Sequence, residues 1–169
     1  SGMVFLALCR FASTIVVLNP RMQEELRLLR YPSVRTACIP NGVDCAVYHP
    51  HTDRLHVRRD MSLPEKPIIL YTGRLSAEKG IATLVRACTH VHSPAAPVLY
   101  IVGSGPEQQP LERLVRELNL GDAVVFVPAR DDILPWYQCA DIFVMPSFHE
   151  GISNSVLEAM ACALPVIAT

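Results

Sequence analysis

The most informative part of the chain reads Asp141-Ile-Phe-Val-Met-Pro-Ser-Phe-His-Glu-Gly-Ile-Ser-Asn-Ser-Val-Leu-Glu-Ala-Met-Ala-Cys-Ala-Leu-Pro-Val-Ile-Ala-Thr169. Its first six residues are mostly apolar and predict a buried strand, whereas the composition of residues 153–163 predicts a helix. Residues 165–169 are again apolar and predict a second strand. A strand, a helix and a strand in close succession are typical of a parallel sheet with crossover helices.

The rest of the chain repeats this alternation. Short apolar runs predict further strands at 14–18, 36–39, 67–73, 97–103 and 123–128. Helical composition predicts helices between them at 21–30, 81–92, 107–118 and 133–139. Most of the predicted strands are apolar throughout, as expected for strands that are covered on both faces. We therefore predict an α/β fold, a Rossmann-like parallel sheet with helices on both faces.

Two segments do not fit the alternation. Residues 44–66 are rich in His, Pro, Arg and Asp and lack periodicity, so we expect a surface connection in which the basic run 54–59 is a solvated loop. Residues 3–18 are apolar but contain Arg10 and are too short to span a membrane. We expect a helix end followed by a strand there.

Composition excludes several classes of protein. Half of the 169 residues are hydrophobic and 18% are charged, which is typical of a globular domain. The net charge of −1 predicts neither a nucleic-acid surface nor an anionic-membrane surface. The six cysteines show no C-x-x-C pair and no zinc-ligand spacing, and most lie in apolar runs. They indicate reduced core residues and a cytoplasmic protein.

Two carboxylates, Glu150 and Glu158, flank the predicted start of the last helix. The backbone N–H groups at a helix start lack intrahelical partners and bind phosphate. Carboxylates accept hydrogen bonds from sugar hydroxyls. The arrangement suits a nucleotide sugar, which carries both groups. A structural alternative stays open, because Ser155-Val-Leu-Glu158 also matches a capping box and a helix dipole favours a carboxylate at Glu150.

Two glycine-containing loops follow predicted strands. In Gly73-Arg-Leu-Ser-Ala-Glu-Lys-Gly80, the cations Arg74 and Lys79 leave one loop and can hold a diphosphate, although a solvated loop would have the same composition. The segment Val-Gly-Ser-Gly-Pro at 102–106 lacks the third glycine of a dinucleotide fingerprint, so we expect a tight turn first and a ligand contact second. Ligands of parallel sheets bind beyond the carboxyl ends of the strands, where both loops are expected.

Together these segments resemble the retaining glycosyltransferases of family 4, the glycosyl transferases group 1, which have the two-domain GT-B fold. The motifs occur in the family's order: Ile-Pro-Asn-Gly-Val-Asp at 39–44, Gly-Arg-Leu-Ser-x-Glu-Lys-Gly at 73–80, Val-Gly-Ser-Gly-Pro at 102–106, Ala-Asp-Ile-Phe-Val-Met-Pro-Ser at 140–147, and Glu150-x7-Glu158 followed by Pro-Val-Ile-Ala-Thr. The resemblance implies that residues 32–169 are the donor-binding C-terminal domain, truncated at its C-terminus. Residues 1–31 would be the closing elements of the N-terminal acceptor domain, or a linker.

The resemblance also implies roles for individual residues. Arg74 and Lys79 would bind the donor diphosphate in place of a metal, Glu158 would hold the ribose, and Glu150 would face the hexose and its reacting side. The remaining donor contacts would come from backbone groups of Gly151, Ile152, Ser153, Asn154 and Ser155, from Leu157 near the nucleoside, and from Pro128 and Arg130 beside the base. No cofactor is expected. Ala163 and Asn19 depart from the family, which usually has Gly and often Ser there; a left-handed turn at Ala163 would be strained.

The function that the resemblance implies is transfer of a hexose, with retention and without a metal, from a UDP-, GDP- or ADP-sugar to a glycan, lipid or small-molecule acceptor. We expect a role in cell-envelope polysaccharide synthesis, in the cytoplasm or at the inner face of the membrane. The 169 residues alone should be inactive, because nearly all of the acceptor domain is missing. Two alternatives remain on the same scaffold: an enzyme like the non-hydrolysing UDP-sugar epimerases, and a nucleotide-binding module without catalysis.

Overall fold

The computed structural model describes residues 12–28, 35–91 and 95–169. The chain divides into two compact units. The first takes in residues 1–42 together with 151–153, and the second takes in 43–150 together with 154–169. The assignment of residues 1–31 to an acceptor domain stays a prediction.

The first unit contains two parallel strands and a helix. Strand β1 (Thr14–Val17) pairs in parallel with β2 (Arg35–Cys38), and α2 (Pro20–Leu28) follows β1, as predicted for 14–18, 36–39 and the start of 21–30. Asn19 precedes α2, and its side-chain oxygen accepts a hydrogen bond from the Met22 N–H at 2.8 Å. Asn and Ser are equally good at this capping position, so the departure at Asn19 has no structural cost.

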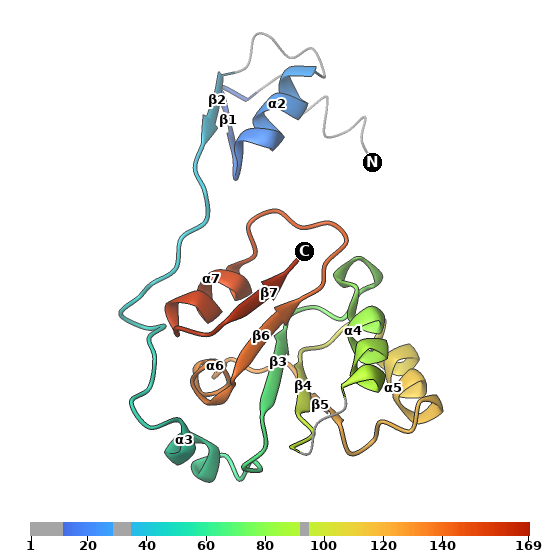
Figure 1. Cartoon of the computed structure of the whole chain (residues 1–169). Helices are drawn as coiled ribbons and strands as arrows, with labels where there is room; N and C mark the ends of the chain where they lie inside the picture. The colour runs from blue at the N-terminus through green and yellow to red at the C-terminus, as the bar shows by residue number, and fades with distance from the viewer. Residues whose placement is uncertain (1–11, 29–34, 92–94) are drawn as a thin grey trace. The chain divides into compact units, whose positions relative to one another are not determined.

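The second unit is built on a five-stranded parallel sheet (Figure 1). Its strands are β3 (Ile68–Thr72), β4 (Val98–Val102), β5 (Val124–Val127), β6 (Ile142–Met145) and β7 (Val166–Ala168). They lie in the order β5-β4-β3-β6-β7, and every neighbouring pair is parallel. All five residues of β4 are buried, which explains why its sequence is apolar throughout. The predicted α/β class is confirmed.

Helices cover both faces of this sheet. They are α3 (Arg54–Asp60), α4 (Ile81–Ala87), α5 (Gln108–Glu117), α6 (Leu134–Cys139) and α7 (Asn154–Ala161), with the 3-10 turns η1 (Ala77–Lys79) and η2 (Cys88–His90) at the ends of α4. The chain runs outward from β3 to β5 and then returns to β6 on the other side of β3. Right-handed crossovers therefore place α4 and α5 on one face and α6 and α7 on the other (Figure 1). Over the residues that the structure describes, no helix has both the length and the apolar character needed to cross a membrane.

The interpretation of residues 44–66 as an irregular surface connection is wrong in part, because α3 lies within it. Asp53 begins this helix by accepting a hydrogen bond from the His56 N–H at 2.9 Å. Val57 packs in the core, and Arg58 is only 5% exposed, so the basic run is not a solvated loop. The residues of this helix are mostly basic or acidic, which is why the sequence showed no apolar period there.

The buried Arg58 is paired at the amino-terminal end of the sheet. Its guanidinium donates to the Cys139 carbonyl at 2.8 Å and to the Asp141 carboxylate at 2.5 Å. Asp141 also accepts from Arg54 at 2.9 Å and from the Ile68 N–H at 2.7 Å. Burial alone would raise the pKa of the Asp141 carboxyl, but the N–H and guanidinium hydrogen bonds hold this pKa below its usual value. The cluster joins α3 to the first residues of β3 and β6.

Ala163 adopts the left-handed conformation that the sequence indicated would be strained, with φ of 56°. The Ala163 N–H donates to the Met160 carbonyl at 2.9 Å, and the Leu164 N–H donates to the Ala159 carbonyl at 3.0 Å. These two bonds form a Schellman motif at the end of α7, in which glycine is the favoured residue. The equivalent position after α5 is Asn119, with φ of 54°, and Asn tolerates this conformation better than Ala.

Candidate functional site

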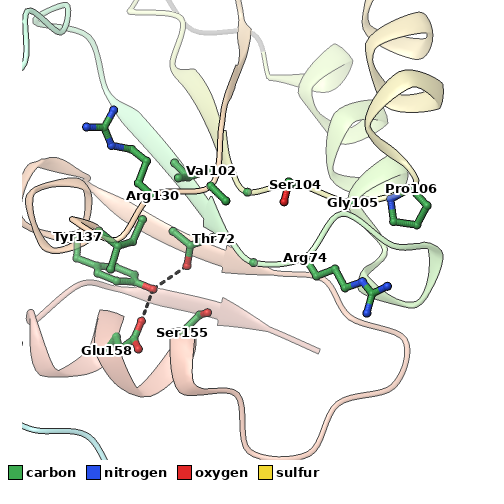
Figure 2. A pocket seen from close by; sticks show the side chains of 14 residues that line it. Thr72, Arg74, Val102, Ser104, Gly105, Pro106, Arg130, Tyr137, Ser155 and Glu158 are labelled. Carbon is green, nitrogen blue, oxygen red and sulfur yellow. Dashed lines mark hydrogen bonds between the residues drawn. The ribbon is translucent and has the colours of Figure 1, made fainter.

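A cavity of about 610 Å³ lies beyond the carboxyl ends of the strands. It sits where the strand order reverses, next to β3, which is the usual ligand position on an open parallel sheet. Its lining comes from the loops after β3, β4 and β5 and from α6 and α7: Thr72, Gly73, Arg74, Val102, Gly103, Ser104, Gly105, Pro106, Ala129, Arg130, Ile133, Tyr137, Ser155 and Glu158. Figure 2 shows Arg74 and Glu158 toward opposite ends of this lining.

Backbone hydrogen bonds join the loops after β3 and β4 into one wall. The Gly73 N–H donates to the Val102 carbonyl at 3.0 Å, and the Leu75 N–H donates to the Ser104 carbonyl at 2.9 Å. A Cβ atom on Gly103 would lie 1.9 Å from the Gly73 carbonyl oxygen, so only glycine allows the loops to approach this closely. The segment 102–106 is therefore a tight turn, as predicted, and it also lines the cavity.

The backbone of Arg74 is held in place by a side chain of β3, the strand that precedes it. The buried Tyr71 hydroxyl donates to the Arg74 carbonyl at 2.9 Å. Burial, with the carboxylates of Glu150 and Glu78 nearby, raises the pKa of Tyr71, so this hydroxyl keeps its proton. The Arg74 side chain forms no salt bridge with any residue in the described part of the chain. It can therefore bind an anion without losing a protein partner.

Lys79 and Glu150 are brought together, but with each other rather than in the lining of the cavity. The Lys79 ammonium forms an ion pair with the Glu150 carboxylate, and the two side chains are 21% and 22% exposed. The Ser147 hydroxyl donates to the same carboxylate at 3.2 Å. The predicted roles of both residues toward a donor stay predictions.

The loops that carry Lys79 and Glu150 are packed against each other. The Phe148 N–H donates to the Glu78 carbonyl at 2.8 Å. A Cβ atom on Gly80 would lie 1.9 Å from the Pro146 carbonyl oxygen, and Gly80 has φ of 65°. Glycine is therefore required here twice, by the close approach and by the left-handed backbone. This contact explains why the motif at 73–80 ends in Gly.

Glu158 is engaged by a residue of another helix. The Tyr137 hydroxyl of α6 donates to Glu158 Oε2 at 2.7 Å and lies 2.6 Å from the Thr72 hydroxyl of β3 (Figure 2). The capping-box interpretation, in which Glu158 turns back to the start of its own helix, does not account for this bond. Glu158 therefore belongs to the lining of the cavity, as the sequence predicted for a ligand-binding carboxylate.

Pro128 and Arg130, the two residues predicted to lie beside the base, differ in their position relative to the cavity. Arg130 lines the cavity and Pro128 does not, whereas Ala129 between them does. The Arg130 guanidinium donates to both carboxylate oxygens of Asp132, at 2.8 and 3.1 Å. This exposed bidentate pair fixes the plane of the guanidinium at the mouth of the cavity.

The other predicted donor contacts fall into three groups. Ser155 lines the cavity, whereas Asn154 and Leu157 lie in α7 outside its lining. Residues 151–153, which are Gly151, Ile152 and Ser153, belong to the first unit, where the Asn41 amide donates to the Ile152 carbonyl at 2.9 Å. Their contact with a donor stays a prediction.

Sequence reasoning missed Thr72 and Tyr137 as site residues. Tyr137 was part of a predicted helix, and one usable signal existed, because it lies four residues after Ile133 and therefore on the same helix face. Thr72 is a polar residue at the carboxyl end of an apolar strand, where ligands bind. Neither signal showed that the two hydroxyls meet.

This chain is similar to known proteins in sequence and in fold. The family model "Glycosyl transferases group 1" matches residues 66–169. The D-inositol 3-phosphate glycosyltransferase of Pseudarthrobacter chlorophenolicus is 35% identical over an alignment of 138 residues, and the match covers 77% of this chain and 33% of that protein. The sucrose-phosphate synthase from Thermosynechococcus elongatus is 35% identical, with a TM-score of 0.85 over 98% of this chain and 43% of its own.

A further solved structure contains a sugar nucleotide. Anabaena HepE, solved in complex with UDP-glucose, is 26% identical to this chain, with a TM-score of 0.84. The match covers 95% of this chain and 45% of HepE. The chain thus spans about a third of the length of the first curated relatives that it matches, and less than half of these solved structures.

Proposed function

The chain belongs to the glycosyl transferases group 1 family, and from this premise we propose that residues 32–169 bind the nucleotide-sugar donor of a glycosyltransferase. The fold is that of GT-B glycosyltransferases. One observation carries the proposal: Arg74 and Glu158 line a single cavity at the point where the strand order reverses. A cation and a carboxylate toward opposite ends of one cavity suit a ligand that carries a diphosphate and, at a distance from it, sugar hydroxyls.

We place the diphosphate at Arg74, the ribose at Glu158 and the base near Arg130. The cavity volume, about 610 Å³, is within the range of small-molecule sites. Lys79 would join Arg74 only by leaving Glu150, so the incoming diphosphate would compete with Glu150 for the ammonium group. The carboxylate of Glu150 would then be free to accept hydrogen bonds from the hexose.

The proposed reaction is hexose transfer with retention and without a metal. Breaking the bond between the sugar and the diphosphate builds negative charge on the leaving phosphate. Arg74 would stabilise that charge without reorganisation, because it already lines the cavity before the donor binds. Lys79 would add its charge once the donor has drawn it away from Glu150. The acceptor, a glycan, lipid or small molecule, would bind to an N-terminal domain, in the cytoplasm or at the inner face of the membrane.

Titration calorimetry with UDP, GDP, ADP and their glucose and mannose conjugates tests donor binding. We expect one nucleotide to bind, and Arg74→Ala to weaken its binding at least about tenfold, as expected for the loss of a charged hydrogen bond. Arg113→Ala, which removes an exposed arginine from α5, is the matched control and should change nothing. If no nucleotide binds, the proposal is wrong.

A full-length protein that carries this chain together with an acceptor domain, supplied with donor and acceptor extracts, separates the alternatives. Release of the nucleoside diphosphate together with a glycosylated product supports the transferase. Formation of an epimeric sugar nucleotide without any acceptor would indicate an epimerase. Nucleotide binding without either product would indicate a binding module.

A further inference from the structure

We propose that Tyr137 is a positioning residue that fixes the Glu158 carboxylate so that its remaining lone pairs accept both ribose hydroxyls, which makes the site selective for ribonucleotides over 2′-deoxyribonucleotides. The proposal rests on the proposed function, because it assumes that the cavity takes a nucleoside diphosphate. It extends that function by assigning a role to Tyr137 and a selectivity to the site.

The direction of each proton in the cluster follows from the chemistry of the groups. An ionised carboxylate only accepts, so the single O–H of Tyr137 must be donated to Glu158. The Thr72 hydroxyl, 2.6 Å away, must then donate to the Tyr137 oxygen. The hydrogen bonds therefore run from the Thr72 hydroxyl to the Tyr137 oxygen and from the Tyr137 hydroxyl to the Glu158 carboxylate. Each bond in such a chain strengthens the other.

The Tyr137 hydroxyl has a fixed position because its ring cannot move. Tyr137 is 1% exposed, and its ring meets those of Tyr48 and Phe143 with centroids 6.0 and 5.8 Å away. Burial raises the pKa of Tyr137; Thr72 opposes this effect and the Glu158 carboxylate adds to it, so the hydroxyl stays protonated. Because the Tyr137 hydroxyl has a fixed position and the glutamate side chain is flexible, their hydrogen bond selects one rotamer of Glu158.

The carboxylate keeps acceptor capacity on the cavity side. Its two oxygens offer about four lone pairs, of which Tyr137 uses one. Tyr48 is a second donor to the carboxylate: burial, the charge of Glu158 and a side-chain hydrogen bond to Glu158 raise the pKa of Tyr48, so about two lone pairs are left. The lone pairs that remain suit two neighbouring hydroxyls. A 2′-deoxyribose would leave one acceptor unpaired in the cavity, and sites built for a hydroxyl reject ligands that lack it.

The test compares the affinities of UDP, GDP or ADP, whichever binds most tightly, and of its 2′-deoxy counterpart. We expect the unsubstituted protein to prefer the ribonucleotide by about tenfold or more. In Tyr137→Phe this preference should fall to about twofold, because Glu158 is no longer oriented. The affinity for inorganic pyrophosphate, which carries no ribose, should stay unchanged. A purely structural defect would weaken pyrophosphate as well.

Two further variants complete the experiment. Tyr100→Phe removes another buried tyrosine hydroxyl, from β4 and outside the cavity lining, and should keep the full preference. Thr72→Val removes the first donor of the chain at nearly constant shape and should lower the preference by about threefold, which keeps the test available if Tyr137→Phe fails to fold.

Each outcome decides the matter. An unchanged ribonucleotide preference in Tyr137→Phe, or in Thr72→Val if only that variant folds, overturns the proposal while leaving donor binding intact. A loss of pyrophosphate affinity equal to the loss of ribonucleotide affinity overturns it too. If the unsubstituted protein binds no nucleoside diphosphate, the proposed function fails first and the role of Tyr137 falls with it.

Discussion

Arg58 and Asp141 meet at the amino-terminal end of the parallel sheet, whereas Arg74 and Glu158 lie at its carboxyl end, in a cavity. Both sets combine an arginine with a carboxylate, but the partners of these groups differ. Asp141 receives hydrogen bonds from a second arginine and from a backbone N–H of the protein. Arg74 forms no salt bridge within the residues that the structure describes, and Glu158 accepts from an uncharged phenol. Charges that are neutralised by the protein support the fold, and charges that keep unused capacity can bind a ligand.

We expect the largest effect from a substitution at the carboxyl end of the sheet, and the quantity affected is the rate of nucleoside diphosphate release. In a full-length enzyme that also carries the acceptor domain, Arg74→Ala should lower the rate of nucleoside diphosphate release from the donor by about 100-fold, since it removes a fixed cation from the leaving phosphate. The free energy of unfolding in urea should stay nearly the same, because Arg74 has no salt bridge to lose. A strong loss of stability would show that Arg74 supports the fold as Arg58 does, and would contradict the distinction between the two ends of the sheet.

The converse change is Asp141→Ala at the amino-terminal end. It leaves the Arg58 guanidinium buried without its carboxylate, and we expect a loss of about 2–3 kcal/mol in the free energy of unfolding. The value is below that for a fully buried pair because the Asp141 side chain is 35% exposed. Asp132→Ala, at the exposed pair with Arg130, is the control and should change stability little. Nucleotide affinity should be unaffected in Asp141→Ala at temperatures where the protein is folded.

Low pH should remove the contribution of Asp141 to the free energy of unfolding. The folded pKa of Asp141 lies below its unfolded value of about 3.9, so the stabilisation is fully present above that pH and is lost as the pH falls through the folded pKa. We expect the stability difference between the unsubstituted protein and Asp141→Asn, measured by urea unfolding, to be constant from about pH 7 to 5 and to shrink below about pH 4. A difference that persists in acid would mean that the charge of Asp141 is not its source.

A smaller effect distinguishes Glu158 from Glu150, the two carboxylates at the carboxyl end of the sheet. Glu158→Gln should weaken nucleoside diphosphate binding by about tenfold, because the ribose loses a charged acceptor. Glu150→Gln should leave that affinity within about twofold and lower the rate of nucleotide release more strongly, since Glu150 is assigned to the hexose. Calorimetry and a nucleotide-release assay measure the two quantities. Equal effects on affinity would contradict the division of roles.

The smallest prediction concerns strain outside both clusters. Ala163→Gly should raise the free energy of unfolding by about 1 kcal/mol, because glycine adopts the left-handed turn after α7 without steric cost. Asn119→Gly, at the matching turn after α5, should change it much less, since Asn already tolerates this conformation. Thermal unfolding of both variants provides the measurement. An equal gain at both positions would show that strain at Ala163 in particular is not the cause, because the greater unfolded-state entropy of glycine lowers stability in both variants.

Most of the fold was accessible from local sequence because its elements are long enough to show their composition. All seven predicted strands formed, and the glycines of 73–80 and 102–106 correctly indicated tight loops at strand ends. Helix α3 was missed because its residues are mostly basic or acidic and because its burial depends on a distant residue, Asp141. Of the predicted cavity residues, Arg74, Arg130, Ser155 and Glu158 line it, and each lies in a loop or a helix that follows a strand.

Local pattern thus determined the strand and helix order, the loops at the carboxyl ends and the residue types that those loops carry, since propensity and turn chemistry act over a few residues. Tertiary structure alone decided which charges meet. It paired Lys79 with Glu150, Arg58 with Asp141 and Tyr137 with Glu158, all of them contacts between segments far apart in the chain. Pairing of this kind depends on the strand order of the sheet, because that order sets which loops are neighbours, and no local pattern encodes it.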